Sequence, residues 1–252
     1  MRFLLTRPQV QCEELGTVLK SNGVEWLGEP LLRITPVRWD PTVLAKPQAV
    51  LLTSANGSRE LLQMPGVRRD LRIFAVGPAT AAALQVAGFS NVQAAGGTAA
   101  SLIAHVRRHV DPRVGRLLHL SGHDISVDLA AGLAPAGFSV DRVIVYRACA
   151  VERLSARALH EMSWNRIDGA VFLSARTAAI FCSLVIAAGL VDACAHMTAV
   201  AISRNVAEAL RPAGFGQVAV AASPCIDSVI EAVLRMAGCQ ELTAHHADAL
   251  LG

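Results

Sequence analysis

Residues 49–56 read Ala-Val-Leu-Leu-Thr-Ser-Ala-Asn, and residues 170–177 read Ala-Val-Phe-Leu-Ser-Ala-Arg-Thr. Each stretch is an apolar run of strand length that ends in hydroxyl, small or polar residues and leads into a helical pattern. A second pair of similar stretches follows, at residues 74–80 and 200–206. The chain therefore repeats a strand–turn–helix unit, which is typical of α/β folds with parallel strands.

A shorter signature marks the ends of helices. Leucine, three further residues, glycine and then valine or phenylalanine occur at residues 19–24, 84–89, 133–138 and 210–215. In each copy the leucine is expected to be the last core contact of a helix, and the glycine to adopt the left-handed conformation that caps it. Four copies of one helix ending predict four related βαβ pieces.

Ten apolar segments have the character of strands, near residues 3–6, 24–27, 50–53, 73–76, 92–94, 117–120, 140–146, 170–173, 199–202 and 218–221. Continuous apolar strands that alternate with amphipathic helices predict doubly wound parallel sheets covered on both faces. The last hundred residues hold only three of these strands, too few for a sheet of their own, while the first thirty hold two.

Pairing the two ends of the chain predicts one discontinuous and one inserted α/β domain. We expect the first to take residues 1–33 and 152–252 and the second residues 42–141. The extended crossings at 34–41 and 142–151 are expected to pair as a two-stranded connector. A simple cut near residue 150 is the alternative.

Composition bounds the class of protein. Of the 252 residues, 53% are hydrophobic and 17% charged, which indicates large buried cores. The net charge of +3 comes from dispersed basic residues, so no nucleic-acid partner is expected. The uncharged run 177–191 is too short for a membrane span, and Met1–Leu5 is too short for a signal-peptide core, so we expect a cytoplasmic protein without a membrane partner.

No cofactor or metal is expected. The six cysteines are scattered without a CxxC pair, and Cys182 and Cys225 fall in apolar periodic segments that suggest buried thiols. Gly96-Gly97-Thr98 lacks the third glycine of a dinucleotide-binding loop. His245-His246 lies in a polar tail and is not interpreted as a metal site.

Ligands of open parallel sheets bind beyond the carboxyl ends of the strands. Seven such ends carry small or hydroxyl residues, at 6–8, 53–56, 77–80, 121–123, 174–177, 203–205 and 222–224. As helix N-caps, they would direct backbone N–H groups and the positive helix dipole at anions. Helix capping alone is one explanation; a large polyanionic ligand is the other, and Arg7, His123, Arg176 and Arg204 among these ends fit it.

Together these residues resemble a known family. Similar stretches occur in uroporphyrinogen-III synthases, in the same order, at residues 4–8, 52–57, 75–81, 143–148, 172–174 and 222–224, which span nearly the whole chain. The resemblance implies two flavodoxin-like domains joined by a two-stranded ladder, with the active site between them and no cofactor.

The family's substrate is hydroxymethylbilane, a linear tetrapyrrole polycarboxylate. In the family its terminal hydroxyl is lost to give an azafulvene, and closure through a spiro intermediate inverts the last pyrrole. The resemblance thus implies a cyclising hydro-lyase, acting as a monomer, with transient hand-over of substrate from hydroxymethylbilane synthase.

Tyr146, the only tyrosine, matches the family's active-site tyrosine, and its phenol could assist the departing hydroxyl as a modest general acid. A tyrosine packed at a hinge is the alternative. Thr80 corresponds to a substrate-contacting threonine. Where the family often has Gly-Pro-Thr-Thr, this chain has Ser-Arg-Asn-Val at 203–206, so Val206 offers no hydroxyl. The other residues expected to bind substrate are Thr6, Arg7, Ser54, Ala55, Ser121, Gly122, Ser174, Ala175, Arg176, Ser203, Arg204 and Asn205.

Two other classes of function have the same architecture. A non-catalytic two-domain protein could close over a small anion, as periplasmic receptors do, although no signal peptide is seen. A sugar-nucleotide transferase is weakened by the lack of an acidic or histidine candidate at the strand ends.

Overall fold

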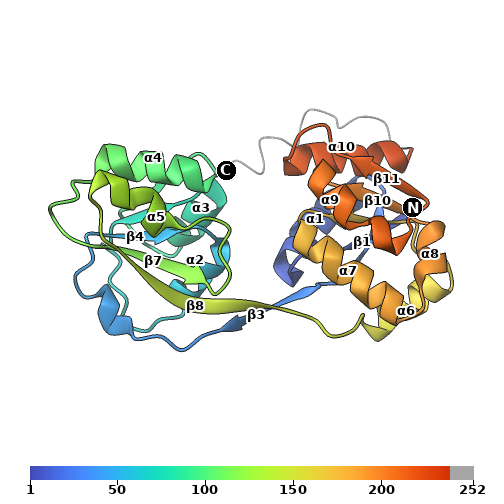
Figure 1. The fold of residues 1–252 in the computed structure, drawn as a ribbon, viewed down its shortest axis with the longest axis horizontal. Helices are drawn as coiled ribbons and strands as arrows, with labels where there is room; N and C mark the ends of the chain where they lie inside the picture. Colours follow the sequence, from blue (N-terminus) through green and yellow to red (C-terminus); the bar gives the residue numbers. More distant parts are fainter. Residues whose placement is uncertain (239–252) are drawn as a thin grey trace. The chain divides into compact units, whose positions relative to one another are not determined.

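The computed structural model describes residues 1–238 and divides the chain into two compact units. Within the described residues, the first unit combines residues 1–33 with residues 150–238. The second is the segment between them, residues 34–149 (Figure 1). Within both units, parallel strands lie between layers of helices, which is the doubly wound α/β class expected from the sequence.

The first sheet has five parallel strands in the order β11-β10-β9-β1-β2. They are β1 (Arg2–Leu5), β2 (Glu25–Gly28), β9 (Gly169–Phe172), β10 (Thr198–Ala201) and β11 (Gln217–Val220). Numbered along the chain within this unit, the order is 2-1-3-4-5, that of flavodoxin. The order reverses between β1 and β9, which is where such sheets bind ligands.

Helices cover both faces of this sheet. One face carries α1 (Gln9–Ser21) and α10 (Ile226–Met236), and the other α6 (Ala156–Ser163), α7 (Ala175–Ala187), α8 (Val191–Ala195) and α9 (Arg204–Ala209), the last followed by the 3₁₀ turn η3 (Arg211–Ala213). Successive strand residues point to opposite faces of the sheet. Phe3 and Leu5 therefore lie in the core beneath α1 and α10, while Leu4 lies in the core on the other face.

The second sheet has six strands in the order β3-β8-β7-β4-β5-β6. They are β3 (Leu32–Pro36), β4 (Ala49–Leu52), β5 (Ile73–Ala75), β6 (Val92–Ala94), β7 (Leu117–Gly122) and β8 (Val140–Ala150). Without β3, and read from the opposite edge, the strands follow one another as β6-β5-β4-β7-β8. Numbered along the chain, this order is 3-2-1-4-5, which differs from the flavodoxin order of the first unit. Here the order reverses between β4 and β7.

The crossing segments differ in detail from the expected connector. Residues 34–41 and 142–149 belong to the second unit, and β3 and β8 are neighbouring strands of its sheet. The amide of Val37 donates to the carbonyl of Val145 over 2.9 Å. The physical reason is that β8 also pairs with β7, from Val140 to Tyr146. β8 therefore belongs to the sheet of the second unit and does not form a separate two-stranded connector with β3.

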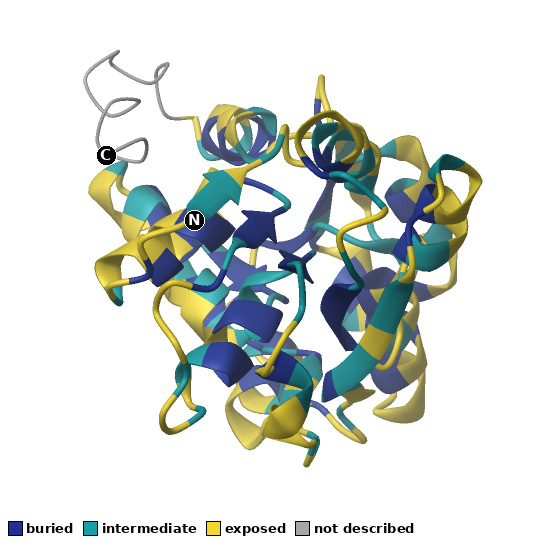
Figure 2. Ribbon diagram, turned by 90° about the vertical axis from the view of Figure 1, so that its left-hand side faces the viewer, coloured by how far each residue is buried: buried dark blue, intermediate teal, exposed yellow. Residues whose placement is uncertain are grey.

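Helices flank this sheet as well. One face carries α2 (Ala55–Leu62), α3 (Pro78–Val86) and the 3₁₀ turn η1 (Pro41–Leu44), and the other α4 (Ala99–His109), α5 (Leu129–Leu133) and the 3₁₀ turn η2 (Ala134–Ala136). Figure 2 shows the central strands mostly buried and the outer sides of the helices exposed. The strand ends at one edge of each sheet are therefore held on a rigid, well-packed layer.

The four helix-ending glycines are confirmed. Gly23, Gly88, Gly137 and Gly214 have φ values of 78°, 88°, 81° and 66°. At the first of them, Val24 donates to the carbonyl of Leu19 and Gly23 to that of Lys20, both over 3.0 Å, which is the Schellman pattern. A side chain with a β-carbon would strain this backbone conformation.

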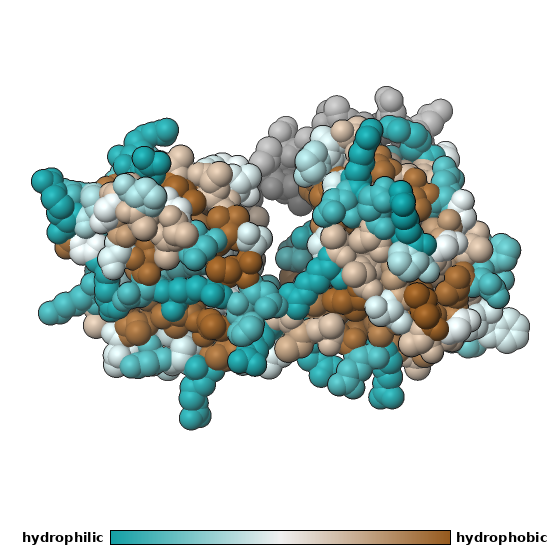
Figure 3. Space-filling view, in the orientation of Figure 1, coloured by the Kyte–Doolittle hydropathy of each residue, from teal (hydrophilic) through white to brown (hydrophobic). Residues whose placement is uncertain are grey.

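The surface of each unit seen in Figure 3 mixes hydrophilic and hydrophobic side chains. Over residues 1–238, no helix has both the length and the apolar character needed to cross a membrane. Cys182 is buried as expected, but the expectation for Cys225 was wrong. It is exposed, because α10 begins only at Ile226 and Cys225 precedes it as the N-cap.

Candidate functional site

The first unit places two sets of predicted residues on neighbouring strands. Thr6 and Arg7 follow β1, and Ser174 to Arg176 follow β9, where the strand order reverses. Thr6 is only 1% exposed, and its hydroxyl donates to the carbonyl of Val171 over 2.7 Å. Its side chain therefore joins β1 to β9 and is not available to donate to a ligand.

Arg7 is half-buried at this edge of the sheet. Burial lowers the pKa of its guanidinium, and the nearby charge of Glu14 partly offsets this effect. An arginine nevertheless stays charged at neutral pH. Its side chain makes no hydrogen bond or ion pair with any residue of the described chain. A partly desolvated, unpaired cation at a helix start favours an anionic ligand.

The remaining predicted residues of this unit begin two helices. The hydroxyl of Ser174, the N-cap of α7, accepts from the amide of Thr177 over 3.1 Å, while Ala175 and Arg176 form the first turn. Ser203 is the N-cap of α9 without a side-chain cap bond, and Arg204 and Asn205 after it are exposed. Because β10 lies beside β9, both helix starts lie at the same edge of the sheet.

In the second unit, a pocket of about 360 Å³ opens at the carboxyl ends of the strands. It lies where the strand order reverses between β4 and β7. Three predicted site residues line it together: Ser54, Gly122 and Tyr146. The rest of its wall consists of Thr53, Val76, Gly97, Thr98, Ala99, Asp124, Ile125, Ser126 and Val127.

Tyr146 reaches the pocket through an irregularity of the sheet. The pairing of β7 with β8 shifts register between Ser121 and Gly122, so Gly122 lies opposite Tyr146 instead of Val145. The ring then lies directly over Gly122, where an added β-carbon would be 2.8 Å from Cε2 and Cζ of Tyr146. Strand irregularities of this kind re-aim side chains next to active sites.

Arg142 ties down the same strand end. Its Nε donates to the hydroxyl of Ser121 over 2.9 Å, and its guanidinium also donates to the carbonyls of Gly122 at 2.8 Å and His123 at 2.5 Å. Ser121 is itself buried, so its hydroxyl serves this network and does not face the pocket. The cation thus fixes the backbone against which Tyr146 packs.

Two other predicted residues of this unit are absent from the pocket lining, as far as the described residues go. Ala55 is the first residue of α2, behind Ser54, whose hydroxyl accepts from the amide of Asn56 over 3.1 Å. Thr80 is in the first turn of α3 and is only 6% exposed. A contact between its hydroxyl and a ligand stays a prediction.

Sequence reasoning missed several pocket residues. Thr98 is the N-cap of α4, where its hydroxyl accepts from the amide of Ser101 over 3.1 Å in a capping box. The glycine pair before it lacks the third glycine of a dinucleotide-binding loop and does not by itself predict a binding site. A threonine three residues before a serine at a helix start was the signal available in the sequence. Thr53 was noted at a strand end but not proposed to bind substrate.

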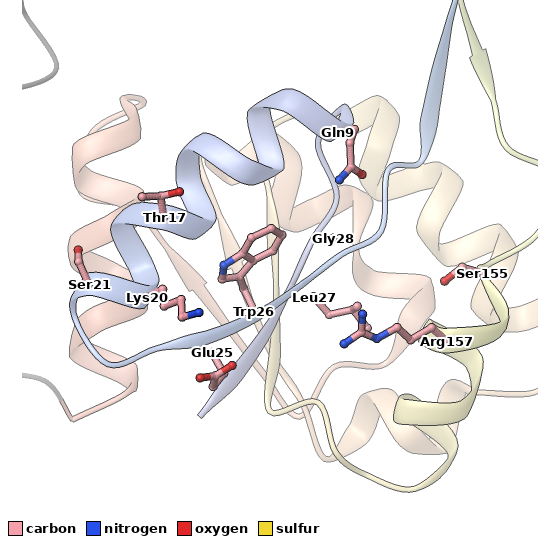
Figure 4. A pocket seen from close by; sticks show the side chains of 10 residues that line it. All are labelled: Gln9, Thr17, Lys20, Ser21, Glu25, Trp26, Leu27, Gly28, Ser155 and Arg157. Carbon is pink, nitrogen blue, oxygen red and sulfur yellow. The ribbon is translucent and has the colours of Figure 1, made fainter.

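A second pocket, of about 750 Å³, runs along the edge strand β2 of the first unit. Figure 4 shows its wall, which includes Trp26, Lys20 and Arg157. The indole of Trp26 covers Gly16, where a β-carbon would lie 2.1 Å from a ring atom. This groove follows the side of an edge strand away from the reversal of strand order, so the fold favours the smaller pocket as the binding site.

Within residues 1–238, no three His, Cys, Asp or Glu side chains gather in a way that could hold a metal ion. His245-His246 lies outside the described residues.

One family model matches most of the chain, and two solved structures are similar in fold. The model of the family described as uroporphyrinogen-III synthase HemD matches residues 13–231. A solved uroporphyrinogen-III synthetase from Helicobacter pylori is similar in structure, with a TM-score of 0.59 and 18% identity over 94% of this chain and 100% of that one.

A mutant uroporphyrinogen III synthase from the extremely thermophilic bacterium Thermus thermophilus has a TM-score of 0.52 and 20% identity over 94% of this chain and 99% of its own. At these identities the two structures show the fold. No curated protein gave a significant match to the sequence. The family match covers most of the chain, and this chain belongs to the uroporphyrinogen-III synthase family.

Proposed function

We propose that this chain cyclises hydroxymethylbilane to uroporphyrinogen III, with loss of water and inversion of the last pyrrole ring. The observation that carries the proposal is the family match over residues 13–231. It favours a synthase over a two-domain anion receptor, whose fold would be similar but whose family is not the one matched. Within the lyases, the reaction is a cyclising elimination of water, and we propose that it needs no cofactor.

The substrate's carboxylates supply the anions that the strand ends are suited to bind. In the second unit, α2 and α4 begin at the pocket with Ser54 and Thr98 as N-caps. Their first-turn amides and positive dipole ends favour acetate and propionate groups. In the first unit, Arg7 and the starts of α7 and α9 offer the same chemistry.

Tyr146 is proposed as the catalytic residue. Departure of the terminal hydroxyl breaks a carbon–oxygen bond, and the adjacent pyrrole nitrogen supplies the electron pair that forms the azafulvene. A phenol that donates its proton to the leaving oxygen lets it depart as water, and the pyrrole nitrogen, acidified by the loss of its electron pair, then returns its own proton to the phenolate. Tyr146 fits this role because its ring lines the pocket and packs against the core that includes Leu120 and Val145.

One assay tests the function directly. Hydroxymethylbilane generated in situ closes without a synthase to isomer I, so purified protein should shift the product to isomer III. Product that stays isomer I at every protein concentration, from protein with a normal melting transition, would contradict the proposal.

Ionic strength should affect substrate capture. Because Arg7, Arg176 and Arg204 are proposed to attract a polycarboxylate, the KM should rise with added salt, since exposed charges are screened within about 8 Å at physiological ionic strength. The kcat should change less, because it reports the bound complex. Steady-state kinetics in sodium chloride of increasing concentration measures both. A constant KM would assign these arginines to the fold or to solubility.

The setting of the reaction is also a proposal. We propose that the protein works in the cytoplasm as a monomer and receives hydroxymethylbilane by transient hand-over from its synthase, without nucleic-acid or membrane partners.

A further inference from the structure

A buried histidine lies behind the wall of the pocket in the second unit. His119 is in the middle of β7, opposite Leu51 of β4, and is only 2% exposed. Its Nε2 is 3.1 Å from Oγ1 of Thr53, which lines the pocket. The imidazole thus holds a pocket hydroxyl from behind, and the catalytic role proposed above does not use it.

The imidazole is uncharged under physiological conditions. Burial, together with the nearby charge of Arg142, lowers the pKa of His119 to about 4. Arg142 is the register partner of His119 on β8, and its guanidinium is bonded to the end of β7. A neutral imidazole carries one N–H, so it donates through one nitrogen only.

A carboxylate ligand requires the Thr53 hydroxyl to donate its hydrogen bond into the pocket. A carboxylate only accepts hydrogen bonds, and a threonine hydroxyl has one proton to give. Thr53 can donate that proton into the pocket only if its bond with His119 runs the other way, from Nε2–H to Oγ1. The tautomer with its proton on Nε2 provides this bond.

We propose that His119 is a positioning residue that fixes the rotamer and proton direction of Thr53, so that Thr53 donates to a carboxylate of the bound substrate. The inference rests on the proposed function, because it takes the ligand to be a polycarboxylate. His119 itself does not touch the substrate.

A pair of matched variants tests the inference. In His119→Gln the amide nitrogen can occupy the place of Nε2, whereas in His119→Asn the amide is too short to reach Thr53. Both replacements bury one neutral amide. His119→Asn should raise the KM for hydroxymethylbilane about tenfold, the effect of about one hydrogen bond, with kcat changed much less. His119→Gln should restore the KM to within about twofold of the unmodified protein.

Thr53 supplies the second measurement and covers the case in which a His119 variant does not fold. Thr53→Val should raise the KM for hydroxymethylbilane to the same extent as His119→Asn. Thr53→Ser keeps the hydroxyl and should have a KM close to that of the unmodified protein. The double variant His119→Asn with Thr53→Val should be no worse than Thr53→Val alone, because one interaction is lost in both.

Equal KM values in His119→Asn and His119→Gln would overturn the proposal, as would additive effects in the double variant or a normal KM in Thr53→Val. The unmodified protein separates these results from the proposed function. If it makes isomer III while the variants behave alike, only the role of His119 fails.

Discussion

Tyr146→Phe is expected to lower the turnover number about 10²-fold, in the lower range for positioned proton donors. The phenylalanine ring keeps the packing against the core that includes Leu120 and Val145, so the melting temperature should change little. The KM should also change little, because helix N-termini and not the phenol hold the carboxylates. Complete inactivation is not expected, since the pyrrole nitrogen already activates the leaving group.

Tyr146→Ala separates catalysis from packing. If Tyr146 only packs within β8, the phenylalanine variant should have normal turnover, and only the alanine variant should lose activity and stability. A catalytic phenol should give low turnover in both variants, and a lowered melting temperature only in the alanine variant. Turnover and thermal unfolding of the two proteins measure the difference, and normal turnover in Tyr146→Phe would rule out the proposed role.

Much of the fold was predictable because its signals are local. Buried parallel strands such as β4 and β9 need side chains that are apolar on both faces, and this requirement is visible in AVLL and AVFL. Helix endings were equally visible, because only glycine adopts a φ of 78° at Gly23 without strain. All ten expected strands are present within the described residues.

What sequence could not supply depends on pairing between distant segments. The register shift that places Tyr146 over Gly122 exists only because β7 and β8 meet. Arg142 gains its role from the same pairing, whereas His119 gains its role from the pairing of β7 with β4, and neither has a neighbour in the sequence that reveals its partner. Its expected role as a helix N-cap predicted Ser54 as a binding residue. Thr53, one residue earlier, was assigned to the end of the strand and not to the site, although both line the pocket.

Gly122→Ala is expected to lower turnover about as much as Tyr146→Phe, roughly 10²-fold. The new β-carbon would lie 2.8 Å from Cε2 and Cζ of Tyr146, closer than real β-carbon contacts, and 3.0 Å from its hydroxyl oxygen, tighter than most of them. The tyrosine ring can move away more readily than the strand, so the main loss should be the position of the phenol. Thermal unfolding should therefore shift only modestly while kcat falls.

Gly115→Ala is the matched control, because the added β-carbon there meets only Cβ of Gln48, at an ordinary 3.7 Å. It precedes the same strand and should leave turnover unchanged. Combining Gly122→Ala with Tyr146→Phe supplies the decisive comparison. If the alanine acts by displacing the phenol, it has nothing left to displace in the phenylalanine background, and kcat should not fall further. A further fall in kcat would mean that Gly122 serves the reaction through its own backbone or the shape of the pocket, and normal turnover in Gly122→Ala alone would show that the observed position of the phenol is not required.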